Sequence, residues 1–332
     1  DYMIDGVHVH QLGLSFRERI RLVPSVLAYY PLMDMALPPI SRCLKQHIQP
    51  YATQADIIHN VRIGREGLSY ASFELARERQ IPFVFTPVHH PRWVGWRYKA
   101  YIQLYRTADA IIALTNAEKE TLLALGVSPE RIFVTGMGPV LAAEAYPQQF
   151  LAEQQIDGPI VLFLGQHYTY KGYEQVLAAT ANVWQKMPEA HFVFIGPSVG
   201  TSEKVFEHFK DPRIHRLGKV DLQTKTNALA ACTLLCVPST QESFGGVYTE
   251  AWSFEKPVIG CNIPAVAEVI THGIDGYLVK QKATEVAESI IDLLANPSKT
   301  KTMGAMGKQK VETRYSWENL AKITEQVYYS LV

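Results

Sequence analysis

The stretch TLLCVPSTQESFGGVYTEAWSFEKPVIGCN, residues 233–262, contains one repeating unit of a parallel α/β sheet. TLLCVPS and KPVIGCN are short apolar runs of the length expected for buried strands. GVYTEAWSF, which lies between them, is predicted to form a helix from about Gly246. TQESFGG therefore connects the carboxyl end of a strand to the start of a helix, which is where open α/β sheets bind their ligands.

Apolar strand-like runs alternate with helical stretches along most of the chain. In the first half, strands are expected in DGVHVHQL, ADIIHNV, IPFVFTPV, ADAIIALT and RIFVTGMG, and helices at 67–79 and 116–125. In the second half, strands are expected in GPIVLFLG, AHFVFIGP, IHRLGKV, TLLCVPS, KPVIGCN and GYLV, and helices at 173–186, 222–231 and from about 246. Residues 142–158 are polar and lack a strand pattern, so we expect a domain boundary there. The alternation predicts an α/β fold with two parallel sheets.

Composition limits the kind of protein. The 332 residues suffice for two domains, and 47% hydrophobic with 19% charged residues is typical of a globular enzyme. Lys plus Arg and Asp plus Glu number 32 each, and this balance argues against a general nucleic-acid binder. The four cysteines form no CxxC pair, which favours free thiols in a reducing cytoplasm. No apolar run reaches the length of a membrane span, and the chain does not open on a signal peptide.

The loop in ESFGGVYTE, residues 242–250, has the composition of an anion-binding loop. Gly245 and Gly246 let the backbone approach a ligand, and the following helix start offers free N–H groups to a phosphate. Glu242 and Glu250 could each accept hydrogen bonds from a polyol. The alternative is a glycine-softened loop with two solvated glutamates.

Other strand ends carry polar side chains. Lys171 precedes Gly172 at a helix start in LGQHYTYKG and suits a phosphate, although it could equally be a surface lysine. His89, His90 and Arg92 follow a strand in FTPVHHPRW and could bind a hydroxyl or phosphate or transfer a proton. Adjacent histidines in an extended segment point to opposite faces, so a metal site is not expected and one of the two is expected to be structural. The Gly-x-Gly of VTGMGPV is compatible with a simple tight turn.

Together these segments resemble glycosyltransferase family 4, the retaining nucleotide-sugar enzymes of GT-B fold. The resemblance runs from about Asp56 to Val279 and is strongest over 237–279, where Pro-Ser, Glu-x7-Glu, Lys-Pro-Val-Ile, Glu-Val-Ile and Gly-x-Leu-Val follow one another. It implies two Rossmann-like domains facing across a cleft. We expect an acceptor-side domain at 1–145, a nucleotide-sugar domain at 157–312, and a C-terminal helix at 316–332 that could pack back on the first domain.

The resemblance assigns roles to individual residues. Glu242 would contact the hydroxyls of the transferred sugar and Glu250 the nucleotide ribose, while Lys171 would steady the leaving diphosphate. The histidine near the donor sugar corresponds best to His90, with His89 the other option. The expected catalytic residues are thus His90, Lys171 and Glu242. The expected donor-binding residues are Gly165, Gln166, Lys171, Val220, Glu242, Ser243, Phe244, Gly245, Gly246 and Glu250.

Three departures from the family pattern stand out. Gln166 occupies the position where the family usually has an arginine beside the diphosphate. The family's N-terminal strand and glycine-rich loop would precede Asp1, so the first domain is expected to be truncated or rebuilt. Residues 14–54 match nothing in the pattern, and we expect them to shape acceptor choice.

The function expected from the resemblance is transfer of a sugar from a nucleoside diphosphate to an acceptor hydroxyl of a glycan, lipid or small molecule, with retention at the anomeric carbon. No Asp-x-Asp motif is present, so neither a metal nor another cofactor is expected. The alternatives are a non-catalytic nucleotide-sugar-binding protein and a nucleotide-sugar epimerase. FRERIRLVPSVLAYY, residues 16–30, could touch a membrane surface and a lipid acceptor, which would place the protein at the inner membrane face. An amphipathic core helix is the alternative, and it is the one we expect.

Overall fold

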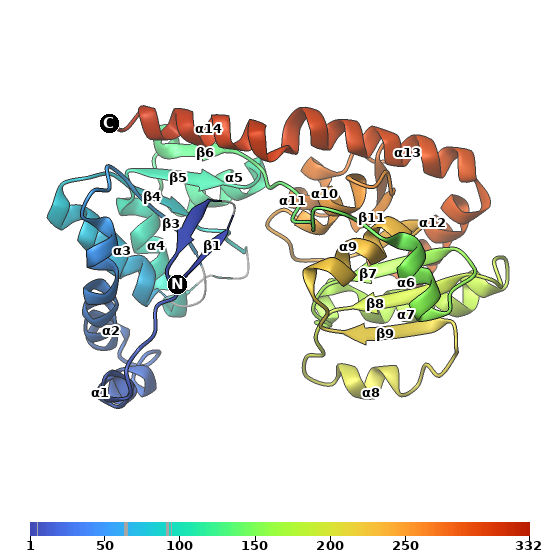
Figure 1. Cartoon of the computed structure of the whole chain (residues 1–332), viewed down its shortest axis with the longest axis horizontal. Coiled ribbons are helices and arrows are strands. Elements are labelled where there is room, and N and C mark those ends of the chain that lie inside the picture. Colours follow the sequence, from blue (N-terminus) through green and yellow to red (C-terminus); the bar gives the residue numbers. More distant parts are fainter. Residues whose placement is uncertain (5, 63–65, 91–92, 94) are drawn as a thin grey trace. The chain divides into compact units, whose positions relative to one another are not determined.

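The computed structural model describes residues 1–332 except 5, 63–65, 91–92 and 94 (Figure 1). It divides into two compact units. The first unit consists of Asp1–Ala113, Glu118–Val134 and Thr324–Val332, and the second of Leu114–Ala117 and Thr135–Ile323. The change of unit at residue 134 comes before the boundary expected at 142–158, where the structure has helix α6, Pro147–Gln154.

The first unit is built on a four-stranded parallel sheet of order β3-β4-β5-β6. These strands are Ile58–Val61, Phe83–Thr86, Ala110–Ala113 and Ile132–Val134. The strand expected over residues 5–12 does not join this sheet. The chain turns at Gly6, whose φ is +81°, so that Val7–Val9 (β2) pairs antiparallel with Tyr2–Ile4 (β1).

The helices of the first unit form successive layers beside this sheet. They are α1 (Phe16–Leu27), α2 (Met33–Ile48), α3 (Gly67–Arg79) and α4 (Lys99–Thr107), and the 3₁₀ turns Gln49–Ala52 and Trp96–Tyr98 connect them to the rest. Helix α3 packs on β3 and β4, α2 packs on α3, and α1 packs on α2 (Figure 1). Residues 14–54, which matched no pattern, therefore supply the two outer layers of this unit.

Helix α1 does not have the orientation expected of a core helix. Only Leu22 of this helix is buried, whereas Phe16, Ile20, Val23 and Leu27 are exposed. The expectation that the stretch 16–30 forms an ordinary core helix is wrong, because its main apolar stripe faces solvent.

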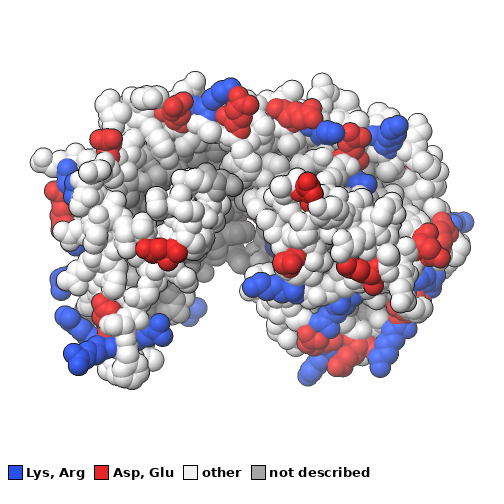
Figure 2. Space-filling model, viewed as in Figure 1, with Lys and Arg blue, Asp and Glu red and all other residues white. Residues whose placement is uncertain are grey.

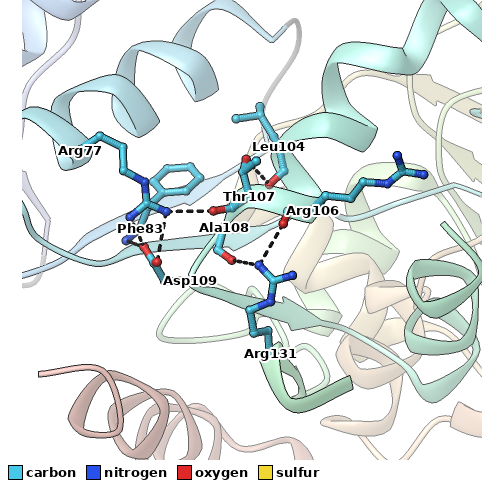
Figure 3. A network of polar contacts seen from close by, with 8 residues as sticks. All are labelled: Arg77, Phe83, Leu104, Arg106, Thr107, Ala108, Asp109 and Arg131. Carbon is cyan, nitrogen blue, oxygen red and sulfur yellow. Dashed lines mark hydrogen bonds and ion pairs between the residues drawn. The ribbon is translucent and has the colours of Figure 1, made fainter. Parts of the chain in front are cut away.

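A polar network ties the strand ends of the first unit to its helices (Figure 3). Arg77 of α3 donates to Asp109 at 2.8 and 3.1 Å, and the backbone N–H of Phe83 donates to the same carboxylate at 2.8 Å. Arg131 donates to the backbone oxygen of Ala108 at 2.9 Å. The network fixes α3 and the segment between α4 and β5 at the amino ends of β4 and β5.

The second unit contains a six-stranded, fully parallel sheet of order β12-β11-β10-β7-β8-β9. In chain order, β7–β12 are Ile160–Leu164, His191–Ile195, Ile214–Gly218, Leu234–Val237, Val258–Cys261 and Gly276–Val279. Its helices are α6, α7 (Tyr173–Trp184), α8 (Ser202–Phe206), α9 (Leu222–Ala231), α10 (Gly246–Trp252), α11 (Pro264–Val269), α12 (Ala283–Ala295) and α13 (Pro297–Lys310). Strands β7, β8, β10 and β11 are buried throughout and form the centre of one hydrophobic core.

Two further helices run from one unit into the other. Helix α5, Asn116–Ala124, and helix α14, Trp317–Tyr329, each contribute residues to both units. The last residues of α14 lie in the first unit, where Tyr328 hydrogen-bonds His59 at 2.6 Å. A π-helical turn, Val311–Tyr315, precedes α14.

Candidate functional site

The centre of the second sheet is its topological switch point. From β7 the chain proceeds to β8 and β9 on one side, and β10, β11 and β12 fill the other side. The loops that follow β7 and β10 therefore leave the same edge of the sheet from neighbouring strands. This is the position at which doubly wound sheets bind ligands.

Lys171 and Glu242 meet at this switch point. Lys171 follows β7, Glu242 follows β10, and their Nζ and Oε1 atoms are 2.5 Å apart. The side chain of Glu242 is 8% exposed and that of Lys171 is 21% exposed. The pair is thus mostly removed from water, but the ammonium group still reaches the surface of the site.

Backbone contacts hold Lys171 in place. The carbonyl of Tyr170 accepts from the N–H of Thr240 at 2.8 Å and from the side-chain amide of Gln281 at 2.9 Å. Gly172 has φ +84°, and a Cβ there would lie 2.6 Å from the carbonyl oxygen of Pro238. Only glycine allows the two loops to approach this closely, so the position of the lysine depends on its neighbour.

The predicted Gly-Gly loop closes tightly on its own helix. Gly245 has φ +86°, and a Cβ there would lie 2.4 Å from the ring of Tyr248, whose hydroxyl donates to Val237. Phe244 is buried edge-on against Tyr315, and Ser243 is also buried. Helix α10 begins at Gly246, so its first N–H groups have no acceptor within the helix.

Glu250 lies one turn inside α10 and is buried. Its Oε1 pairs with Nζ of Lys225 at 2.8 Å, and Lys225 also donates to the backbone oxygen of Val140 at 2.7 Å. Its other oxygen, Oε2, is buried and has no hydrogen-bond partner among the described residues. Burial raises the pKa of Glu250, although its contacts with Lys225 and with the backbone of Val140 oppose this. The site therefore holds one carboxylate oxygen that can accept a hydrogen bond from a ligand.

The remaining predicted donor-binding residues lie at the same edge of the sheet. Gly165 directly follows β7, and its N–H donates to the oxygen of Ile195 at the end of β8. Gln166 is exposed. Val220 follows β9, is partly buried, and precedes Asp221, whose carboxylate caps α9 by accepting from Thr224. The fold thus brings every predicted donor-binding residue to one edge of one sheet.

The two predicted histidines belong to the other unit. His89 is buried, contacts the hydroxyl of Tyr105 at 3.2 Å, and has its pKa lowered to about 4, chiefly by burial. His90 is less buried and packs against Trp93, with ring centroids 4.5 Å apart. These surroundings make His89 the structural member of the pair. Arg92, the third member of the predicted cluster, lies outside the described residues.

Sequence reasoning missed Lys225. It lies in the first turn of α9, within LQTKTNALAA, and no motif marks it. Its only distinguishing feature is a cationic side chain on a helix that starts at the carboxyl edge of the sheet.

The described residues include one group of side chains that could hold a metal ion, and it lies elsewhere. Glu18, Cys43 and His47 are on α1 and α2 of the first unit. There the carboxylate already pairs with the imidazole at 2.8 Å. The three cysteines of the second unit are buried free thiols.

Two protein-family models match the chain. Residues 148–310 match "Glycosyl transferases group 1", and residues 1–138 match "Glycosyl transferase 4-like domain". The boundary between the two matches lies close to the junction of the two units.

Curated relatives are distant in sequence. D-inositol 3-phosphate glycosyltransferase of Kribbella flavida is 26% identical over 246 residues, which cover 68% of this chain and 57% of the relative. Alpha-maltose-1-phosphate synthase of Mycolicibacterium smegmatis is 24% identical over 261 residues, 70% of this chain and 67% of the relative. The chain spans 57% and 48% of the first two curated relatives that it matches.

Solved structures share the fold. HepE of Anabaena in complex with UDP and glucose superposes with a TM-score of 0.72 at 18% identity. The match covers 89% of this chain and 81% of the HepE chain. Sucrose-phosphate synthase of Thermosynechococcus elongatus superposes with a TM-score of 0.76 at 22% identity. The match covers 91% of this chain and 79% of the synthase chain. The predicted fold class, α/β of GT-B type with Rossmann-like domains, is confirmed.

Proposed function

The chain belongs to the glycosyltransferases that these two family models describe, and from this premise we propose that it transfers a sugar from a nucleoside diphosphate to an acceptor hydroxyl. The donor would bind at the carboxyl edge of the second sheet. HepE, a structural neighbour, holds UDP and glucose, so UDP is the first nucleotide to test.

One observation carries the proposal: Glu250 keeps a buried oxygen without a hydrogen-bond partner at the predicted ribose position. Leaving a buried carboxylate oxygen without a hydrogen bond costs free energy, and a ligand hydroxyl would recover that cost. Lys225 fixes the opposite oxygen, so the free oxygen has a defined direction. A ribose hydroxyl is a donor of the required kind.

The remaining residues divide into contacts with the sugar and contacts with the diphosphate. Glu242 would accept from sugar hydroxyls, and Lys171, already paired with it, would move toward the diphosphate as negative charge develops there. The backbone amides of Phe244, Gly245 and Gly246 would complete the anion site. His90 of the first unit would act near the anomeric carbon once donor and acceptor are bound.

The proposed chemistry is retention by attack from the face that the diphosphate leaves. The bond from the anomeric carbon to the diphosphate breaks as the bond to the acceptor oxygen forms, and the acceptor's proton passes to the departing phosphate. Lys171 supplies the positive charge that such a leaving group requires, so no metal or other cofactor is included in the proposal. This mechanism is proposed by analogy with the family.

The acceptor in this proposal is a carbohydrate or lipid-linked hydroxyl. Among the helices of the described residues, none combines the length and apolar character that crossing a bilayer requires. The proposal places the protein in the cytoplasm. Peripheral contact with the inner membrane face belongs to the same proposal, because a lipid-linked acceptor would be found there.

The test is calorimetric titration of a panel of nucleoside diphosphates into the wild-type chain, Glu250→Ala and Glu250→Gln. We expect one diphosphate to bind, and Glu250→Ala to weaken it by about 10-fold or more, since hydrogen bonds to charged groups contribute ~1.5–3 kcal/mol. Glu255→Ala is the matched control, because this carboxylate pairs with Lys308 on the surface of the same unit. Equal affinity of wild type and Glu250→Ala would refute the assigned ribose contact.

Nucleotide binding should also depend on pH through Glu250. Its raised pKa means that the buried carboxylate takes up a proton at a higher pH than an ordinary glutamate does, and the protonated form is a weaker acceptor. Lowering the pH should therefore weaken diphosphate binding by wild type more than by Glu250→Gln. The measurement is the diphosphate affinity of wild type and of Glu250→Gln, determined by the same titration at a series of mildly acidic pH values. If both affinities change with pH in parallel, the prediction is wrong.

A nucleotide-sugar-binding protein without transferase activity is the second candidate, and Gln166 favours it. This exposed, uncharged residue stands where an arginine is expected beside the diphosphate. The two candidate functions are distinguished by an assay for hydrolysis or transfer of the sugar from the donor that calorimetry identifies. Tight binding with no turnover over a broad acceptor panel would favour the second candidate.

A further inference from the structure

Helix α1 presents an apolar face to solvent at the outer layer of the first unit. Phe16, Ile20, Val23 and Leu27 recur at helical spacing and line one side, which we name the α1 face. Phe16 is 77% exposed and Leu27 is 78% exposed. Exposed apolar side chains continue beyond the helix at Tyr30, Leu32 and Met35. Several large apolar side chains exposed on one side of one helix indicate a binding surface.

The side of α1 that faces the protein carries the helix's only acidic residue. Glu18 accepts from Ser15 through Oε2 at 2.7 Å and pairs through Oε1 with His47 of α2 at 2.8 Å. Hydrogen bonds from Ser15 and His47 lower the pKa of Glu18 to about 2, so this negative charge stays within the protein's own contacts. Leu22 is buried on the same side.

The other charged residues of α1 are arginines. Arg17, Arg19 and Arg21 are all exposed. By helical geometry Arg17 and Arg19 flank the α1 face, whereas Arg21 lies toward the side that carries Glu18. Figure 2 shows Lys and Arg side chains gathered around the end of the first unit where Figure 1 places α1. A positive rim around an apolar face complements an anionic, apolar surface.

Aromatic side chains of the kind that lie at membrane interfaces stand beside this rim. The guanidinium of Arg97 lies 5.7 Å from the ring centroid of Tyr30 and 5.3 Å from that of Trp96. Trp96 is 57% exposed. Tryptophan, tyrosine and arginine are the residues that anchor proteins at the headgroup level of a bilayer.

We propose that the α1 face is a docking surface for anionic phospholipid membranes, with Phe16, Ile20, Val23 and Leu27 inserted at the interface and Arg17 and Arg19 contacting headgroups. The occupant is a lipid surface because arginines flank an exposed apolar helix side, and the nearby acidic side chains of Glu18 and Asp34 are paired with His47 and Lys99. The inference deepens the membrane contact named with the proposed function, because it assigns that contact a surface and a class of lipid. It concerns the first unit alone and does not depend on donor binding.

The test is flotation of the full chain with vesicles of phosphatidylcholine alone and of phosphatidylcholine mixed with phosphatidylglycerol. We expect wild type to float with the anionic vesicles and to be released as salt is raised. Phe16→Ser combined with Leu27→Ser should lower the vesicle association constant by about 10-fold or more, because both side chains would lose the burial of their apolar area. Arg17→Gln combined with Arg19→Gln should weaken binding to anionic vesicles and reduce its salt dependence.

The matched control is Ile274→Ser combined with Tyr329→Ser, which removes two exposed apolar side chains far from α1 in sequence. This variant should bind vesicles as wild type does. Circular dichroism should show that all variants keep their fold, since every substituted side chain is exposed.

Three results would overturn the proposal. The first is the absence of vesicle binding by wild type, and the second is equal binding by the Phe16→Ser, Leu27→Ser variant. The third is a concentration-dependent dimer of wild type in sedimentation that the same variant abolishes while vesicle binding is unchanged, which would assign the α1 face to a second copy of the chain. Neither measurement uses a sugar donor. A negative result would therefore refute membrane docking without bearing on the proposed transfer reaction, which the nucleotide titration tests.

Discussion

Replacing Lys171 by methionine is expected to lower sugar transfer by ~10²-fold or more, the cost typical of losing one group that stabilises transition-state charge. Methionine keeps the length of the side chain and removes its charge. The partner carboxylate of Glu242 would then lie largely buried without the cation that is 2.5 Å away in the intact chain. Turnover should fall more than affinity for the diphosphate product, because the charge on the leaving group develops fully only during the reaction.

The control for this substitution is Lys186→Met, which removes an exposed lysine two residues after the end of α7. It should leave both turnover and affinity unchanged. Glu242→Gln, together with the variant that carries both Lys171→Met and Glu242→Gln, completes a double-mutant cycle. If the pair acts as a unit, the double variant should lose less than the sum of the two single losses. Turnover of Lys171→Met within a few-fold of wild type would rule out the assigned role of this lysine.

The position of the site followed from the sequence because strand ends are local features. Apolar runs identified β7 and β10, and the polar residues immediately after them had to lie at the carboxyl edge of a parallel sheet. Helix limits were similarly well determined: α3 spans the predicted residues 67–79 and α9 the predicted 222–231. In these segments the periodicity and the flanking residues favour the same structure.

Contacts between distant segments could not be predicted in the same way. The partner of Glu250 is Lys225, 25 residues earlier on a different helix, and only the packed fold brings the two side chains together. Lys225 pairs with one oxygen of Glu250, and the other oxygen, which carries the proposed function, has no hydrogen-bond partner among the described residues. No spacing rule in the sequence contains that information.

The orientation of α1 shows a second limit. An amphipathic pattern reveals that a helix has two different sides but does not reveal which side faces the protein. Here the inward side is defined by the contact of Glu18 with His47, 29 residues away on α2. That polar contact turned the apolar stripe outward, against the usual arrangement that the sequence led us to expect.

The second large effect is expected from Gly196→Ala, which should lower the free energy of unfolding of the second unit by ~3 kcal/mol or more, the upper range for backbone strain with a steric clash. Gly196 follows β8 with φ +141°, and a Cβ there would lie 2.0 Å from the carbonyl oxygen of Gly165. The clash is with backbone, so no side-chain rotation can relieve it. The midpoint of urea unfolding, followed by fluorescence, measures the loss.

Gly200→Ala separates strain from clash in the same loop. Gly200 has φ +59°, but a Cβ there meets nothing within 4 Å, so this variant should lose only the ~1 kcal/mol of left-handed backbone conformation. Equal losses for the two variants would show that the loops after β7 and β8 can separate freely. If the two loops cannot separate, the folded Gly196→Ala protein should also bind the nucleotide more weakly. The added methyl group would displace Gly165, and with it the start of the loop that carries Lys171. Stability and donor affinity would then depend on the same contact between two glycines.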